Sequence, residues 1–529
     1  MRPRISRLLP VTAALAAILV VATGCGSPAA TPSPVRTGPV AQTTEGLVLG
    51  TAPPGHEVFR GIPYAAAPVG EGRWRSPRPP APWTGVRDAT VPGPTCPQTW
   101  PGPDGAAQFS GTEDCLFLNV DTPSRTGARP VMVFLHGGGF TGGSGAPYDS
   151  TRIVTRGDVV VVTLNYRLGA LGFLDHPGLD DPAAGAFGIA DQQAALRWVQ
   201  RNIAAFGGDP ADVTLWGESA GAFSTCAHLA SPGARALFTQ AIVQSGPCAN
   251  PLLDRAAAHR RSGAVAASLG CPDPTRAVSC LRALPFEALV GLGDDQTRRV
   301  HRTIAELPWL PVSGTPLLPE DPLDAITAGR GNPVPLLAGG TRDEMRLFVA
   351  GEFDAAGRPL SAEQYPGELD RLFGPAGPRV AELYPAADHP SPGIALATAL
   401  SDEGRMLGAC TQPPFNDAVA TRAPVYSFEF ARPMTEAMGG MPLGAAHGAD
   451  VPFLFDSAFP GAPPPARTPA EDALAGRLID YLTGFARTGR PAPDWAPWPE
   501  GRTRRITDGP PEQIDLRAAH RCAAWDHLR

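Results

Sequence analysis

The sequence predicts an α/β fold with a mostly parallel central sheet, helices on both faces and cap-like insertions. Short runs of β-branched and other apolar residues, which predict strands, occupy 131–135, 159–164, 213–216, 241–245, 334–340 and 425–430. These runs lack strict polar–apolar alternation, as is typical of strands buried on both faces of a parallel sheet. Helical periodicity over 188–206 and 470–489 falls between and after the strands. Strands that alternate with helices predict βαβ units.

Two long segments do not fit the strand–helix alternation. Residues 250–330 and 345–420 are rich in Pro and Ala, with helical patches between loops. We expect them to form a cap around a site on the sheet. A length of 529 residues would usually indicate several domains, but large α/β enzymes carry such insertions on one sheet. We therefore expect one domain over residues 46–529.

Composition excludes several classes of function. The net charge is −7 and no long run of like charge occurs, so the sequence does not predict nucleic-acid binding. All 44 basic residues counted as Lys or Arg are Arg. Lysine Schiff bases, Walker-type phosphate loops and Ser–Lys dyads are therefore excluded, because each requires an ammonium group.

The N-terminus is typical of an export signal. A basic start is followed by 17 apolar or small residues over 8–24, and "ATGC" resembles a bacterial lipobox ending at Cys25. We predict a signal peptide over 1–24, acylation of Cys25 and a flexible Pro/Ser/Thr-rich tether over 25–45. The protein is then exported and anchored to the membrane by this lipid, or secreted. An uncleaved anchor is the alternative, since the apolar run approaches spanning length.

Cysteine usage agrees with export. Eight cysteines remain besides Cys25, and an even number in an exported chain favours disulfides. The chain has no C-x-x-C spacing, so the sequence predicts no metal site.

A G-x-S-x-G motif, "GESAG" at 217–221, contains a candidate nucleophile. By chance about 0.3 such motifs are expected from the 60 Gly and the serine content, so the motif alone is weak. However, it directly follows the strand 213–216 and precedes a helix-compatible stretch, which is the context of a nucleophile elbow. Ser219 is therefore the candidate nucleophile, with a structural glycine-rich turn as the alternative.

A glycine-rich loop, "HGGGF" at 136–140, also directly follows a predicted strand. Glycines let backbone N–H groups approach an oxyanion, and Gly138, Gly139 and Ala220 could donate together. The alternative is a purely structural loop.

Taken together, these motifs resemble the type B carboxylesterases, the α/β-hydrolase family that includes the cholinesterases. The resemblance runs from about residue 45 to the C-terminus. Its segments are 59–70, 113–120, 136–140, 165–174, 202–222, 243–246 and 444–455. It implies an α/β-hydrolase fold and a serine esterase that acts on small to medium carboxylic esters through an acyl-enzyme. It implies neither a metal nor an organic cofactor.

The resemblance assigns the nucleophile to Ser219, the base to His447 and the acid to Glu344. This agrees with the chain order Ser, acid, His that the fold requires. Asp343 precedes the acid directly, so the two carboxylates are alternatives from sequence alone. The family has Gly after the catalytic Glu, whereas this chain has Met345.

Four histidines follow Glu344, namely His389, His447, His520 and His527. His389 lies in a proline-bound loop, and the last two lie near the chain end. His447 has a glycine after it and precedes the apolar run 451–455, which favours it as the base.

Two further carboxylates lie close to these residues in sequence. Glu218, beside the nucleophile, resembles a family carboxylate that supports the site and can bind water or cationic groups, and a solvated turn residue is the alternative. Asp450, three residues after His447, is expected to support the loop and not to take part in the chemistry.

The resemblance also implies covalent and ionic links. It implies the disulfides Cys96–Cys115, Cys271–Cys280 and Cys410–Cys522. Cys226 and Cys248 remain, and we expect them to pair because their parent elements should be neighbours. It further implies the ion pairs Arg60–Glu113 and Arg167–Asp191.

Two other functions are alternatives to ester hydrolysis. A catalytically silent cell-surface binding or adhesion protein of the same fold is disfavoured, because Ser219, Glu344 and His447 are all present. Cholinesterase activity would need an aromatic cation site. Trp100 lies between Cys96 and Cys115, but the loop is short and only 7% of residues are aromatic, so we expect no choline site.

Overall fold

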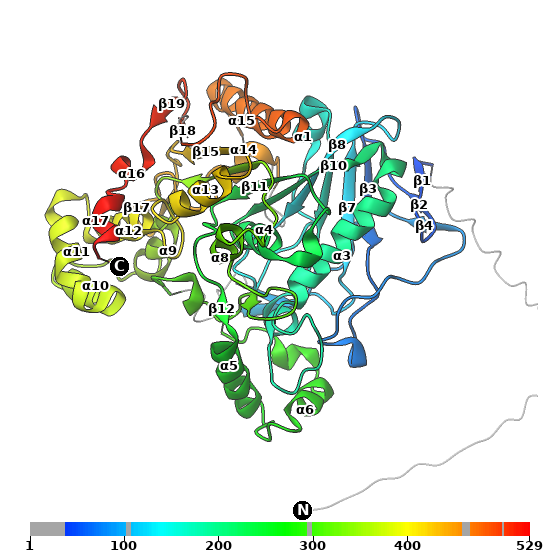
Figure 1. Cartoon of the computed structure of the whole chain (residues 1–529), viewed down its shortest axis with the longest axis horizontal. Coiled ribbons are helices and arrows are strands. Elements are labelled where there is room, and N and C mark those ends of the chain that lie inside the picture. The colour runs from blue at the N-terminus through cyan, green and yellow to red at the C-terminus, as the bar shows by residue number, and fades with distance from the viewer. Residues whose placement is uncertain (1–36, 102–106, 294–298, 458–465, 500–501, 529) are drawn as a thin grey trace, which may run out of the picture. The chain divides into compact units, whose positions relative to one another are not determined.

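A ten-stranded sheet runs through the centre of the described chain (Figure 1). The computed structural model describes residues 37–101, 107–293, 299–457, 466–499 and 502–528. The strand order is β19-β18-β15-β14-β11-β10-β8-β9-β7-β3. All six predicted strands are confirmed: β8 (Arg129–Leu135), β9 (Val160–Leu164), β10 (Gly208–Glu218), β11 (Gln240–Gln244), β14 (Leu336–Thr341) and β15 (Val425–Phe430). They are neighbours and pair in parallel, which confirms the mostly parallel sheet.

The outer strands were not predicted. They are β3 (Glu57–Pro63), β7 (Phe117–Thr122), β18 (Thr503–Ile506) and β19 (Glu512–Ile514). β18 contains two adjacent arginines, and it is stable because Arg504 stacks on Trp495 while Arg505 pairs with Glu429. β3 contains Gly61 and a register shift against β7. A strand prediction based on short apolar runs misses both kinds of strand.

Helices cover both faces of the sheet (Figure 1). Val131, Val133 and Leu135 of β8 face one hydrophobic core, which contains residues of α3, α4 and α13. Met132 and Phe134 face the other core, which contains residues of α1, α14 and α15. The bounds are α1 (Thr151–Gly157), α3 (Phe187–Asn202), α4 (Ala220–Ala230), α13 (Gln412–Ala420), α14 (Val451–Leu454) and α15 (Pro469–Thr488).

Both predicted helices are present. α3 is followed by a 3₁₀ turn over Ile203–Phe206, so the expected span is helical throughout. α15 begins at a capping box, in which Thr468 and Glu471 satisfy each other's free amides, and ends at Gly489 in the left-handed conformation.

The two long insertions carry several additional helices. Their bounds are α5 (Arg255–Ser268), α6 (Ala277–Ala283), α8 (Pro322–Thr327), α9 (Arg346–Val349), α10 (Tyr365–Phe373), α11 (Gly377–Leu383) and α12 (Pro392–Glu403). Figure 1 shows α5 and α6 projecting below the sheet, and α10 and α11 at its side. By contrast, α13 packs against β14 and β15 and belongs to the sheet layer.

The folded unit begins earlier than expected. It spans Gly38–Arg529, and β1 (Val40–Gln42) pairs with β2 (Leu47–Leu49). Ala41 is buried, and Thr44 donates to the Asn202 side chain. The predicted tether boundary at residue 45 is therefore wrong, because this short pairing is hidden in a Thr- and Pro-rich composition. The predicted signal peptide and Cys25 lie outside the described residues.

Covalent and ionic links tie distant segments together. The disulfides are Cys96–Cys115, Cys226–Cys248, Cys271–Cys280 and Cys410–Cys522. The bidentate ion pair Arg167–Asp191 is present and buried. Within the described part of the chain, no helix is both long and apolar enough to cross a bilayer.

The expected ion pair Arg60–Glu113 is wrong. Arg60 contacts Asp121, because β3 and β7 pair with Val58 opposite Asp121. Glu113 binds Arg73 instead, in a buried bidentate pair with distances of 2.7 and 2.8 Å.

Candidate active site

Ser219 lies at a sharp turn between β10 and α4. Its φ is 56° and its ψ is −122°, a strained conformation for a residue with a side chain. The Ser219 amide donates to the carbonyl of Gln244 on β11, at 2.9 Å. The turn therefore projects the hydroxyl beyond the end of the strand, as in a nucleophile elbow.

The two glycines of the motif are required by space. A methyl group on Gly221 would overlap the Leu135 carbonyl oxygen, and one on Gly217 would overlap the Gly221 carbonyl oxygen. The chain thus approaches itself at distances that only glycine permits.

The three residues assigned by the resemblance come together in one hydrogen-bonded chain. His447 Nε2 lies 2.8 Å from Ser219 Oγ, and His447 Nδ1 lies 2.7 Å from Glu344 Oε2. The other oxygen of Glu344 accepts from the Thr341 amide at 2.8 Å. Because a carboxylate only accepts, the neutral imidazole carries its proton on Nδ1 and leaves Nε2 free to accept from Ser219.

The structure separates Glu344 from its neighbour Asp343. Asp343 exchanges backbone and side-chain hydrogen bonds with Ala445 and pairs with Arg342 and Arg346, whereas Glu344 bonds the imidazole. It therefore holds the loop that carries the histidine. Met345, where the family has Gly, is buried and its amide donates to Ser401 Oγ on α12.

Three backbone amides face the same cavity as Ser219. Within the described residues, the N–H groups of Gly138, Gly139 and Ala220 have no protein acceptor. All three residues line the cavity, and Gly138 and Gly139 have φ values of 106° and 59°. Free amides next to a nucleophile can bind an oxyanion.

Two additional carboxylates surround the imidazole. Glu218 Oε1 lies 3.5 Å from His447 Nε2, outside hydrogen-bond geometry. Burial, with the charges of Asp450 and Glu344, raises the pKa of Glu218 to about 7 against the opposing effect of His447. Asp450 accepts from Gln244 Nε2 at 2.7 Å, and burial raises its pKa too.

These carboxylates perturb the imidazole itself. Burial lowers the pKa of His447, but the charges of Glu344 and Glu218, together with the hydrogen bond to Glu344, outweigh burial and raise it to about 9. The cluster therefore stabilises the imidazolium form.

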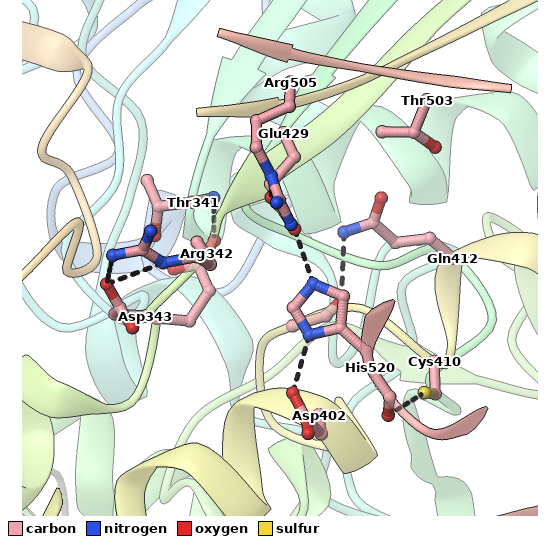
Figure 2. A network of polar contacts seen from close by, with 12 residues as sticks. Thr341, Arg342, Asp343, Asp402, Cys410, Gln412, Glu429, Thr503, Arg505 and His520 are labelled. Carbon is pink, nitrogen blue, oxygen red and sulfur yellow. Dashed lines mark hydrogen bonds and ion pairs between the residues drawn. The ribbon is translucent and has the colours of Figure 1, made fainter. Parts of the chain in front are cut away.

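A second histidine, His520, lies between two carboxylates and does not line this cavity. His520 Nδ1 lies 2.6 Å from Asp402 Oδ1, and Nε2 lies 2.5 Å from Glu429 Oε1 (Figure 2). Both nitrogens must donate, so the ring is an imidazolium and cannot accept a proton. His520 is therefore no candidate base. His389 packs near Tyr384 and does not line the cavity.

The cavity above Ser219 has a volume of about 330 Å³ and is mainly apolar. Its walls come from the glycine loop, from α4 and from both insertions, as expected of a cap. Trp100, considered above for a choline site, is part of the wall, and the wall residues that sequence reasoning did not consider include Tyr148, Phe223, Leu307, Phe348 and Met406. No local motif marks them, because only the fold brings them together. Within the described residues, no three His, Cys, Asp or Glu side chains form a metal-binding group.

Comparison with known proteins gives consistent results. The carboxylesterase family model matches residues 37–508. The para-nitrobenzyl esterase of Bacillus subtilis (strain 168) is 35% identical over 480 residues, covering 87% of this chain and 92% of the esterase. The phenmedipham hydrolase of Pseudarthrobacter oxydans is 36% identical over 485 residues, covering 88% of this chain and 93% of the hydrolase. A solved PNB esterase structure superposes with a TM-score of 0.76 at 33% identity, covering 92% of this chain and 100% of that one.

The parallel sheet, the elbow and the helices on both faces define an α/β-hydrolase. The chain belongs to the carboxylesterase family and is a carboxylic ester hydrolase.

Proposed function

We propose that the protein hydrolyses small to medium carboxylic esters through an acyl-enzyme on Ser219. The observation that carries this proposal is the hydrogen-bonded chain Glu344–His447–Ser219 beside three free backbone amides in one cavity. His447 is the base, Glu344 orients it, and Gly138, Gly139 and Ala220 form the oxyanion hole.

In acylation, Ser219 Oγ attacks the ester carbonyl while its proton moves to His447 Nε2. The carbonyl oxygen becomes an oxyanion held by the three amides. When the C–O bond to the alcohol breaks, His447 gives its proton to the leaving alkoxide. Glu344 remains ionised and stabilises the transient imidazolium.

In deacylation, a water molecule takes the place of the alcohol. His447 accepts one proton of the water while its oxygen attacks the acyl carbon, and the same amides hold the second oxyanion. Collapse breaks the bond to Ser219, whose oxygen recovers the proton from His447. The carboxylic acid leaves and the enzyme is restored.

The cavity favours uncharged substrates with an apolar portion. Its walls include Trp100, Phe223 and Phe348, and Glu218 is the carboxylate deep in the pocket beside Ser219. Para-nitrobenzyl esters, which the name of one relative mentions, are therefore suitable first probes alongside a p-nitrophenyl acyl-length series.

Replacing the nucleophile tests the proposal. Ser219→Ala should abolish hydrolysis of p-nitrophenyl butyrate and covalent labelling by an organophosphate, because both need the hydroxyl. Ser279→Ala on α6 is the matched control: its hydroxyl donates to the Arg276 carbonyl, and the variant should keep both activities. Retained labelling in Ser219→Ala would rule out this nucleophile. Absence of hydrolysis and labelling in the wild type would favour the silent binding protein instead.

We also propose that the protein is exported and acylated at Cys25. Four disulfides support an oxidising compartment. Metabolic labelling with palmitate in a bacterial host should mark the wild type but not Cys25→Ser. The variant should also be absent from the membrane fraction. Unlabelled protein that stays membrane-bound would instead indicate an uncleaved anchor.

A further inference from the structure

We propose that Gln98, on β5 (Gln98–Pro101), positions the glycine loop formed by residues 137–143 and thereby aims the oxyanion-hole amides. This inference rests on the proposed function, because it assigns Gln98 a part in stabilising the oxyanion of that reaction. Gln98 itself contacts no reacting atom.

The Gln98 side chain makes a two-point contact with a single residue of the loop. Its Oε1 accepts from the Gly143 amide at 2.8 Å, and its Nε2 donates to the Gly143 carbonyl at 3.0 Å. The same Nε2 donates to the Cys96 carbonyl at 3.0 Å. Since the Gly143 amide can only donate, the orientation of the Gln98 amide is fixed. Gln98 is 1% exposed, so its hydrogen bonds do not compete with water.

These two bonds fix both peptide planes that flank the Gly143 α-carbon. Gly143 has a φ of 106°, and a methyl group there would overlap His136 Nδ1. The loop therefore contains a glycine, the residue that loses the most conformational entropy when it is ordered. A side-chain clamp on Gly143 removes that freedom.

The clamp is transmitted to the oxyanion hole through one carbonyl group. The amides of Thr141 and Gly142 both donate to the Gly138 carbonyl, at 3.1 and 3.0 Å. In a planar trans peptide the carbonyl of Gly138 and the amide of Gly139 point in opposite directions. Holding the Gly138 carbonyl toward Gly142 therefore directs the Gly139 N–H away from the loop interior, and Gly139 lines the cavity.

β5 supports the loop a second time through Trp100. A methyl group on Gly142 would lie 3.5 Å from Gln98 Oε1 and 3.9 Å from two atoms of the Trp100 ring. The ring thus lies against the loop while it lines the cavity. The disulfide between Cys96, two residues before β5, and Cys115, two residues before β7, links the starts of these two strands. The disulfide therefore restrains β5 at the end that carries Gln98, and so restrains its contacts with the loop.

Two substitutions of similar volume separate hydrogen bonding from packing. Gln98→Met removes all three hydrogen bonds, and Gln98→Glu removes only the donors. We expect kcat for p-nitrophenyl butyrate to fall at least about tenfold in both, with KM changed by less than about threefold, because misaimed oxyanion donors act in the transition state. The inhibition constant of a trifluoromethyl ketone, whose adduct is an oxyanion, should rise in parallel with the loss of kcat/KM.

Gln193→Met is the matched control. Gln193 is also buried, and its amide donates to Ser231 Oγ at the far end of α4. It should lower the melting temperature by an amount comparable with Gln98→Met, yet leave kcat and the ketone inhibition constant unchanged. A merely structural role for Gln98 would give that same pattern.

Folded Gln98 variants with kcat and ketone inhibition within about twofold of the wild type would overturn the proposal. If the variants do not fold, a crystal structure of the wild-type ketone adduct decides. The Gln98–Gly143 bonds should persist in it, and their opening would overturn the proposal. A wild type that forms no adduct at Ser219 would instead overturn the proposed function and this inference together.

Discussion

The His520 cluster makes the stability of the protein depend on pH in a way that one substitution isolates. Burial lowers the pKa of His520, but the hydrogen bonds to Asp402 and Glu429 and their charges outweigh burial and raise it to about 9. An ordinary histidine has a pKa of 6.5. A difference of about 2.5 units corresponds to about 3 kcal/mol of stabilisation by the imidazolium.

The sign follows from the raised pKa. The folded state holds the proton more tightly than the unfolded chain, so the stabilisation is complete below pH 6.5 and disappears as pH rises through about 9. His520→Gln removes the cation from buried Asp402 and leaves Glu429 with Arg505 alone, so it should cost about 3–5 kcal/mol at pH 6. The difference between wild type and variant should then shrink by about 3 kcal/mol between pH 6.5 and 9.5.

Differential scanning calorimetry under non-reducing conditions measures this difference. For a folded unit of about 490 residues the unfolding entropy is about 1 kcal/mol/K, so the gap in melting temperature should narrow by about 3 °C over that range. His447 titrates in both proteins, so its contribution cancels in the difference. A gap that stays constant, or widens, as pH rises would refute the assignment of an imidazolium at His520.

Three further substitutions test the site. Glu218→Gln removes a negative charge beside His447, so the pKa of His447 should fall. In a pH–rate profile, the acid limb of kcat/KM should therefore move to lower pH. A limb at the same or a higher pH would contradict this. Gly221→Ala should give little soluble, folded protein because a methyl group there meets backbone, whereas Gly263→Ala in α5, where nothing lies within 4 Å, should be neutral or raise the melting temperature. Trp100→Ala should raise KM for a para-nitrobenzyl ester about fivefold, because about 1 kcal/mol of ring contact is lost. The KM for the methyl ester of the same acid should change little. Equal effects on the two esters would exclude contact between Trp100 and the substrate ring.

The centre of the fold was predictable because its strands share one physical property. The six central strands are covered on both faces, so each contains a short apolar run. They are β8, β9, β10, β11, β14 and β15, and their alternation with helices supports the prediction of a parallel sheet. The outer strands are stable for other reasons. Arg504 in β18 depends on Trp495 and Asp494, residues whose proximity only the folded chain shows.

The site was predictable to the extent that it is built from local motifs. The elbow around Ser219 and the glycine loop each occupy a few consecutive residues after a strand. Gln98 carries no such signal, because its partner Gly143 lies 45 positions away. The Arg60–Glu113 pair that the resemblance implied is wrong for a related reason, since the β3–β7 register determines the partner of Arg60.

The two buried histidines show what separates the proposed base from a structural cation. Both lie beside carboxylates, and in both cases these raise the pKa to about 9. At His520 each ring nitrogen has a carboxylate oxygen within 2.6 Å, so the proton can leave neither side without breaking a hydrogen bond. At His447 one nitrogen faces Glu344, but the other faces the Ser219 hydroxyl, with Glu218 held back at 3.5 Å. A hydroxyl can donate where a carboxylate cannot, so the partner of the second nitrogen, and not the pKa, leaves His447 able to accept a proton.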